Sequence, residues 1–237
     1  MTDSIVVDLG GHTVSVTVKR SALARRISLR VDPARGAVLM LPAKARLAEG
    51  ERFLLAHRVW LAEKLARLPG KIALGEGAEV PLLGVPHAIR HVPQARRGVW
   101  VEDGALLVSG LPEHVGRRVA DFLKAEARRL IVPRAHDMAA RLGRKVARIT
   151  VKDTRSRWGS CSSAGDLAFS WRLVLAPPMV LDYVVAHEVA HLVEMNHSPA
   201  FWAVVDQLVG DVRAPKRWLK AHGPGLHRFQ GCATNGV

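Results

Sequence analysis

The sequence predicts an α+β protein, with a β-rich N-terminal part and a helix-rich C-terminal part. Short apolar runs separated by Gly, Pro and Asp turns fill most of the chain before Pro112. One stretch within that part, and most of the chain after Pro112, carry apolar residues at helical spacing instead. The 237 residues are enough for one large domain or two small ones, each with a hydrophobic core. We expect two regions, residues 1–111 and 112–237.

The N-terminal region is expected to consist of paired strands and one helix. Turn residues mark the pairs, as at Asp103–Gly104, a dipeptide typical of tight hairpin turns. The elements expected in chain order are a hairpin about Gly10–Gly11, a strand pair within 25–42 with a turn at Pro33 and Gly36, a helix over Leu47–Leu68 ended by Pro69–Gly70, and strands within 78–92 and 98–110.

The C-terminal region is expected to contain long helices and a small sheet. Residues 113–143 form a basic amphipathic pattern, either one helix or a pair broken near Pro133. The elements expected after it are strands within 146–153 and 166–176, a helix over 178–195 introduced by Pro177–Pro178, a short helix after Ser198 and a basic helix over 214–222.

Composition and charge limit the class of protein. Apolar residues make up 49% of the chain and charged residues 24%, which disfavours a disordered chain. The net charge of +14 has two interpretations: an arginine-rich solvated surface, or a polyanionic partner such as nucleic acid or nucleotide phosphates. Two cysteines, Cys161 and Cys232, are too few for a secreted disulfide framework. With no signal-like start and no long apolar run, we expect a cytoplasmic protein without a membrane partner.

The segment HEVAHLVEMNH, from His187 to His197, is the main candidate site. The expected helix around it is apolar on nearly every face, so burying His187, Glu188 and His191 is costly unless they are paired or bind a metal. A core histidine pair with a buried Glu salt bridge is the structural alternative. Histidines four residues apart share a helix face, about 6 Å apart, and suit one tetrahedral zinc ion. Glu188 can then act on a water molecule at the metal.

A third zinc ligand is required, and His197 is the nearest candidate. A continuous helix would carry His197 about 15 Å beyond His187, so the helix must end first. Asn196 is a suitable stop, and Ser198–Pro199 is typical of the start of a new helix. The alternative ligands are Glu194, which could also orient an imidazole, His222 and His227.

The stretches YVVAHEVAHLVEMNHSPAFW and RWGSCSSAGDLAFSWRL closely resemble the YgjP-like metallopeptidase family, which is related to the SprT-like and WLM zinc metalloproteases. The resemblance is dense from Arg148 to Trp218, and RRISLRVDPARGAVLMLP and FLLAHRVWL extend it less specifically into the N-terminal half. It implies a zincin-like core, His187, His191 and His197 as zinc ligands, Glu188 as catalytic base, and a peptide or protein substrate.

Residues 155–176 are expected to lie beside the metal. The strand Leu167–Leu173 is the candidate edge that would hold an extended peptide, as the resemblance implies. Cys161 and Tyr183 are more typical of core residues, and surface arginines of a solvated face. The candidate substrate-binding residues are Arg157, Trp171 and Arg172, with Arg155 as a further arginine near the motif.

Three functions remain open from the sequence. The first is a zinc-dependent metallopeptidase. The second is a metal-dependent nucleoside triphosphate (pyro)phosphohydrolase, favoured by the net charge and by arginines near the motif; an arginine pointing into the cleft would support it. The third is a nucleic-acid-associated protease or binding module, in which the basic helix GRRVADFLKAEARRL would dock on phosphates.

Overall fold

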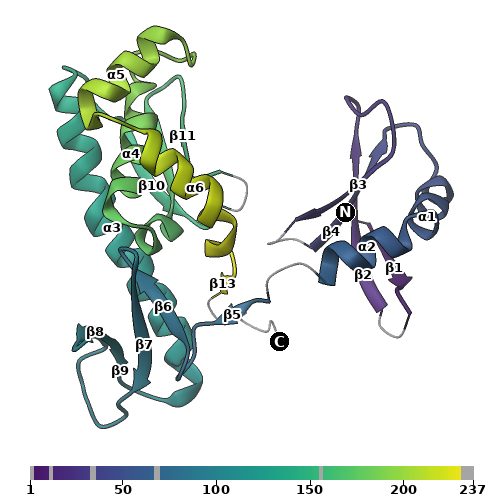
Figure 1. Cartoon of the computed structure of the whole chain (residues 1–237), viewed down its shortest axis with the longest axis horizontal. Coiled ribbons are helices and arrows are strands. Elements are labelled where there is room, and N and C mark those ends of the chain that lie inside the picture. Colours follow the sequence, from purple (N-terminus) through teal and green to yellow (C-terminus); the bar gives the residue numbers. More distant parts are fainter. Residues whose placement is uncertain (1–2, 11–12, 33–35, 67–69, 155–156, 231–237) are drawn as a thin grey trace. The chain divides into compact units, whose positions relative to one another are not determined.

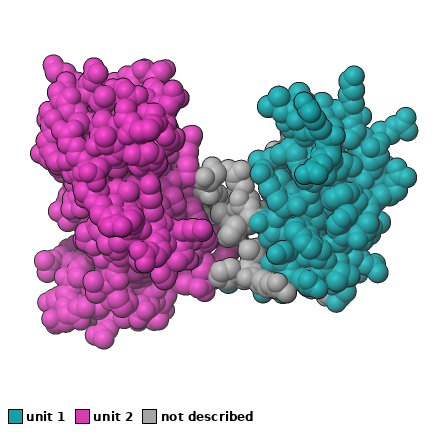
Figure 2. Space-filling model, turned by 45° about the horizontal axis from the view of Figure 1, so that its top comes forward, with its two compact units in different colours: residues 1–70 teal, residues 71–237 magenta. Residues whose placement is uncertain are grey.

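The computed structural model describes residues 3–10, 13–32, 36–66, 70–154 and 157–230. It is an α+β protein, as predicted, with several sheets and six α-helices among the described residues (Figure 1). The chain divides into two compact units, Met1–Gly70 and Lys71–Val237 (Figure 2). Gly11, Pro33, Pro69, Arg155 and Cys232 lie outside the described residues. Within the described residues, no helix has the length and apolar character needed to cross a membrane.

The first unit is a four-stranded sheet with two helices on one face. Its apolar core, which includes Val16, Leu39, Leu54 and Leu61, joins the sheet to the helices. The strand order is β1-β2-β4-β3, and β2 and β4 are parallel. The elements are β1 (Ser4–Asp8), β2 (Thr13–Ser21), β3 (Ser28–Asp32), β4 (Gly36–Pro42), α1 (Leu47–Ala56) and α2 (Arg58–Ala66).

The single helix expected over Leu47–Leu68 is two helices. The break falls at His57, whose backbone N–H donates to the carbonyls of Phe53 and Leu54 at 3.1 Å each. Its ring Nδ1 also lies 2.8 Å from the carbonyl oxygen of Phe53. The side chain therefore bonds to the end of α1, and the chain starts a new helix at Arg58.

The second unit begins with a sheet of order β6-β7-β9-β8. The hairpin turn expected at Asp103–Gly104 is confirmed, since both residues have positive φ, 47° and 69°. The elements are β5 (Ile72–Ala73), β6 (Glu79–Leu82), β7 (Val85–His91), β8 (Val99–Glu102) and β9 (Ala105–Val108).

This sheet shares one core with the helices that follow it. Val80, Ile89 and Leu106 belong to the same buried cluster as Val119 and Leu123 of α3. α3 spans Val115–Arg141 after a short 3₁₀ turn, η1 (Pro112–His114), and runs unbroken through Pro133. The region boundary expected between residues 111 and 112 therefore falls inside the second unit.

A three-stranded sheet precedes the helix that carries the HEVAH motif. It consists of β10 (Arg148–Lys152), β11 (Gly159–Cys161) and β12 (Asp166–Ser170), in the order β10-β12-β11. The strand expected over 166–176 ends at Ser170, because the Ser170 hydroxyl accepts the N–H of Arg172 and starts the 3₁₀ helix η2 (Trp171–Leu175). β12 is thus the central strand, so the edge role expected for Leu167–Leu173 is wrong; the edge strand that contacts α4 is β11.

The remaining elements are three helices and a short strand, namely α4 (Pro178–Ala190), α5 (Pro199–Val209), α6 (Arg213–Leu226) and β13 (Phe229–Gln230), which pairs with β5. The start of α4 at Pro178 is confirmed, and α5 starts after Ser198 as predicted. α4 ends earlier than the expected residue 195, and α6 is longer than the expected 214–222. Contacts of α4 with α3, α5, α6 and β11 explain why it is apolar on most faces.

Candidate metal centre

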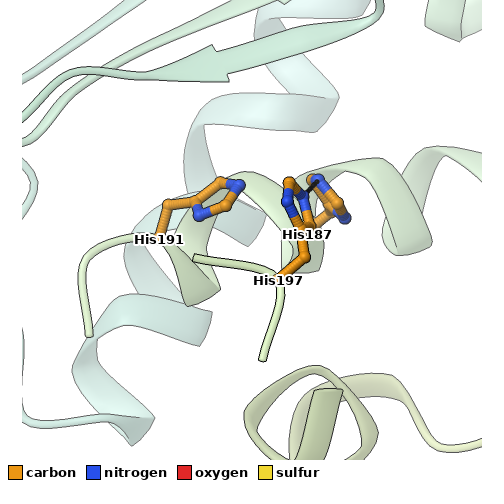
Figure 3. A group of neighbouring side chains, drawn as sticks. All are labelled: His187, His191 and His197. Atoms are coloured by element: carbon orange, nitrogen blue, oxygen red, sulfur yellow. Dashed lines mark hydrogen bonds between the residues drawn. The ribbon is translucent and has the colours of Figure 1, made fainter. Parts of the chain in front are cut away.

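The imidazoles of His187, His191 and His197 come together at the end of α4 (Figure 3). Each offers a ring nitrogen, and these three atoms lie within 4.8 Å of one another. The Nε2 atoms of His187 and His197 are 3.0 Å apart. A tetrahedral zinc ion with Zn–N bonds of about 2.0 Å needs its nitrogen ligands roughly 3.3 Å apart. The three nitrogens therefore fit a metal ion after a small adjustment.

The end of α4 brings His197 back to the cluster. Its last helical residue is Ala190, and His191 is the C-cap, so the stop comes five positions before the expected Asn196. Tight turns follow, in which the N–H groups of Leu192 and Val193 donate to Val189 and Ala190. The Ser198 hydroxyl then accepts the N–H of Phe201 and starts α5. His197 lies in the corner between the two helices, as its sequence position predicts.

The hydrogen bonds of the three imidazole rings are compatible with a bound cation. Nδ1 of His191 lies 3.0 Å from the backbone carbonyl of Glu194 and must donate to it, so Nε2 keeps its lone pair. The Nε2 atoms of His187 and His197 are in hydrogen-bond contact, so one proton lies between them, and a cation can take its place. The Glu194 side chain, His222 and His227 do not join the cluster in the described part of the chain.

Burial and nearby charges shift the pKa values of His187 and Glu188. Burial lowers the pKa of His187 to about 4, with further lowering by His191, His197 and Lys216, so this imidazole is neutral near pH 7. Burial raises the pKa of the Glu188 carboxyl to about 7, and the Arg157 guanidinium opposes part of that rise. Glu188 is 7% exposed and belongs to the same helix as His187. A carboxyl with such a pKa can both accept and return a proton near neutrality.

A hollow of about 240 Å³ lies beside His187. It opens between β11, α4 and α6, and its wall includes Glu188 and one of the candidate substrate-binding residues, Arg157. The residues that line it are Arg157, Trp158, Gly159, Tyr183, Val184, His187, Glu188 and Leu219.

Gly159 is a site residue that the sequence pattern did not single out. A Cβ atom at this position would lie 2.5 Å from Oε1 and 2.7 Å from Cδ of Glu188, which is too close for any side chain. β11 therefore packs its backbone directly against the carboxyl. An isolated glycine within a strand is a known mark of such a close approach, so the signal was present in RWGSCSS.

Trp171 and Arg172, expected to bind substrate, do not line the hollow. Trp171 is buried, and Arg172 is 4% exposed, with its guanidinium paired with Asp153 and donating to the carbonyl of Phe229 at 3.2 Å. The sequence placed them near the site because a continuing strand would have carried them along the cleft. The turn into η2 directs both into the core instead.

Cys161 and Tyr183 lie near Glu188 without joining the histidine cluster. The pKa of the Cys161 thiol is raised by burial and by the Glu188 carboxylate, and its Sγ donates to the carbonyl of Ser162 at 3.3 Å. The Tyr183 ring meets the ring of His187 edge-on, with centroids 6.0 Å apart. Burial raises the pKa of its phenol, so Tyr183 stays protonated and can donate a hydrogen bond into the hollow.

A comparison with protein-family models matches residues 25–222 to the YgjP-like metallopeptidase domain. The chain belongs to the YgjP-like family. The match includes the three histidines, Glu188 and β11, and it starts within the first unit. The resemblance noted from the sequence motifs is therefore confirmed. Membership of a metallopeptidase family agrees with a cluster of three imidazoles that can hold a metal ion.

Other comparisons add little to the YgjP-like assignment. No curated protein matches the chain. Among solved structures, the chain is similar to the metallopeptidase zymogen of Pyrococcus abyssi abylysin. The two share 17% sequence identity over 44% of this chain and 91% of that one, with a TM-score of 0.30.

Proposed function

We propose that this YgjP-like protein is a zinc-dependent peptidase in which His187, His191 and His197 hold the metal and Glu188 is the general base. When bound, zinc supplies Lewis acidity, which acidifies water and polarises a carbonyl group. Glu188 takes a proton from the attacking water and returns it to the amine that leaves. The observation that carries this proposal is the buried Glu188 carboxyl, with a pKa of about 7, in the wall of the hollow beside three converging imidazoles.

The hollow offers further groups that suit a peptide bond. Arg157 and the protonated Tyr183 can stabilise negative charge that develops on the scissile carbonyl oxygen. Among the described strands, β11 pairs with β12 alone, through Gly159, Ser160 and Cys161. Its other side is a strand edge at which an extended peptide can bind through main-chain hydrogen bonds. The substrate strand therefore lies along β11 rather than along β12.

The test is peptide cleavage by the zinc-loaded protein, followed as new N-termini by mass spectrometry on a denatured protein substrate. Glu188→Gln keeps the shape of the side chain and removes its proton-accepting role. We expect it to lower the cleavage rate by about a hundredfold or more at matched zinc content. Glu79→Gln, at an exposed carboxyl of β6, is the matched control and should cleave like the wild type. Equal rates for wild type and Glu188→Gln would exclude this role.

A nucleoside triphosphate (pyro)phosphohydrolase is the second candidate, because Arg157 does line the hollow. Arg172, the other described arginine that could have gripped phosphate, is buried against Asp153. Phosphate or pyrophosphate release from a nucleotide panel, lost in Glu188→Gln, would favour this candidate over the peptidase.

The nucleic-acid alternative has less support, since α3 pairs basic residues with acidic ones in Arg117–Asp121, Arg129–Glu126 and Arg134–Asp182.

A further inference from the structure

The first unit has a hollow of its own, with a volume of about 490 Å³. It lies between strand β3, with the residues just before it, and the helices α1 and α2. The residues that line it are Arg26, Ile27, Ser28, Leu29, Phe53, His57 and Trp60. None of them belongs to the metal centre, and the metallopeptidase reaction does not explain why they form a hollow.

The walls of this hollow are apolar and aromatic. The rings of Phe53 and His57 are stacked, with centroids 4.1 Å apart and an angle of 22° between them. Trp60 is 38% exposed, although a tryptophan is usually well buried. The first unit also carries much of the exposed large hydrophobic surface of the described chain, at Val6, Leu23, Leu47, Leu55, Val59 and Trp60. Of these six, Trp60 alone lines the hollow, and an exposed aromatic ring in an apolar hollow is typical of an interaction surface.

A strand edge borders the hollow. β3 is the last strand in the order β1-β2-β4-β3, and among the described strands it pairs with β4 alone. The pairing starts at Ser28, so Arg26 and Ile27, which also line the hollow, lie beyond the ladder. The outward N–H and C=O groups of an edge strand accept another extended chain. The hollow would receive a side chain of that added strand.

The charged residues near this edge determine which kind of chain can bind there. The charged residues from position 24 to position 31 are Arg25, Arg26 and Arg30, all of them basic. Arg25, Arg26 and Arg30 are exposed. An added strand therefore meets positive charge at the start and middle of β3, before Asp32 ends the strand, and this charge favours carboxylates beside its apolar anchor.

We propose that the β3 edge and its hollow bind an extended acidic polypeptide segment, which adds a strand to the sheet and places an apolar side chain against Phe53, His57 and Trp60. This is a binding surface separate from the metal cleft, and it needs neither the metal nor Glu188. Aromatic and arginine side chains also suit single-stranded RNA. The peptide is favoured because the hollow is bordered by a strand edge and the aliphatic side chains Ile27 and Leu29 form part of its wall, whereas single-stranded RNA needs neither a strand edge nor aliphatic contacts.

The experiment measures binding of a fluorescent peptide to the full-length Glu188→Gln protein in EDTA, so that neither metal nor cleavage contributes. The peptide alternates β-branched residues with glutamates and has a central leucine. Two competitors are used: the same peptide unlabelled, and a version with N-methylated amides along one edge. Trp60→Ser removes a wall of the hollow. Val59→Ser is the matched control, because Val59 is the neighbouring exposed apolar residue of α2 and does not line the hollow.

We expect saturable binding that Val59→Ser retains and that Trp60→Ser weakens by about tenfold or more. The N-methylated peptide should compete poorly, because it cannot pair with β3. The proposal is overturned if no binding occurs, or if both variants bind like the parent protein. It is also overturned if a labelled single-stranded RNA binds, with strong salt dependence, and the peptide does not. Because the assay contains no metal, its failure would leave the peptidase proposal untouched, and the reverse also holds.

Discussion

Gly159 shows at the residue scale how the fold positions the Glu188 carboxyl, which we propose to be the general base. We expect Gly159→Ala to push Glu188 away, since an added Cβ would lie 2.5 Å from its Oε1. A displacement of about 1 Å at a reacting group can reduce the rate a hundredfold. The peptidase kcat should fall by about tenfold to a hundredfold while zinc binding is retained.

The measurement for Gly159→Ala is kcat with zinc content, compared with Gly225→Ala as the control. Gly225 also lies in the second unit, and a Cβ there meets nothing within 4 Å. A general effect of adding a methyl group would slow both variants alike. A kcat unchanged in Gly159→Ala would show that β11 can move away from Glu188 without consequence.

The three histidines should contribute together to metal affinity. Replacing His187, His191 or His197 with alanine leaves two nitrogens, too few to hold zinc tightly. We expect each substitution to weaken zinc binding by at least about a hundredfold, more than is usual for groups that only orient a ligand. Competition with a chromogenic chelator measures this affinity, and His222→Ala, at an exposed histidine outside the cluster, should bind like the wild type.

At the element scale, the sequence predicted most helices and strands but not all of their ends. Proline and serine signals located the starts of α4 and α5 because they act locally. The sequence does not predict the end of α4 or the turn after β12, because Val189–Val193 and Trp171–Leu175 are apolar apart from His191 and Arg172 and continue the preceding pattern. The Ser170 hydroxyl, which accepts the N–H of Arg172, decides the second of these ends.

The missed turn changes what Arg172 does. Because its guanidinium is buried and bonded to Asp153 and Phe229, we expect Arg172→Leu to lower the free energy of unfolding by roughly 1–3 kcal/mol. Asp153 is half exposed, which keeps the effect moderate. Arg157→Leu, at an exposed side chain that lines the hollow, should instead leave stability unchanged and raise KM or lower kcat.

Denaturant unfolding and steady-state kinetics on these two variants test both assignments together. If the Arg172→Leu protein is stable and its KM is altered, Arg172 binds substrate, as predicted from the sequence. If the Arg157→Leu protein is destabilised but has normal kinetics, Arg157 takes no part in substrate binding or in the reaction.

At the scale of the whole molecule, the division into units depends on which residues share a core. The sequence places a change of character near Pro112, where strands give way to helices. A change in element type is not a domain boundary when both sides bury their apolar faces together. Leu74, Val80, Ile89 and Leu106 pack in one cluster with α3, whereas residues 1–70 have a separate cluster of their own. That long-range sharing is not visible in local periodicity.

Two truncated chains distinguish these boundaries. We expect residues 71–237 to fold alone, bind zinc as the full chain does and cleave short peptides with kcat/KM within about twofold, because their core contains no residue of the first unit. Residues 112–237 should fail to fold cooperatively, since they lose the β6–β9 side of the core. Circular dichroism on heating and zinc titration measure both outcomes. If residues 112–237 melted cooperatively with a full zinc site, the sheet would be an accessory to the peptidase core rather than part of it.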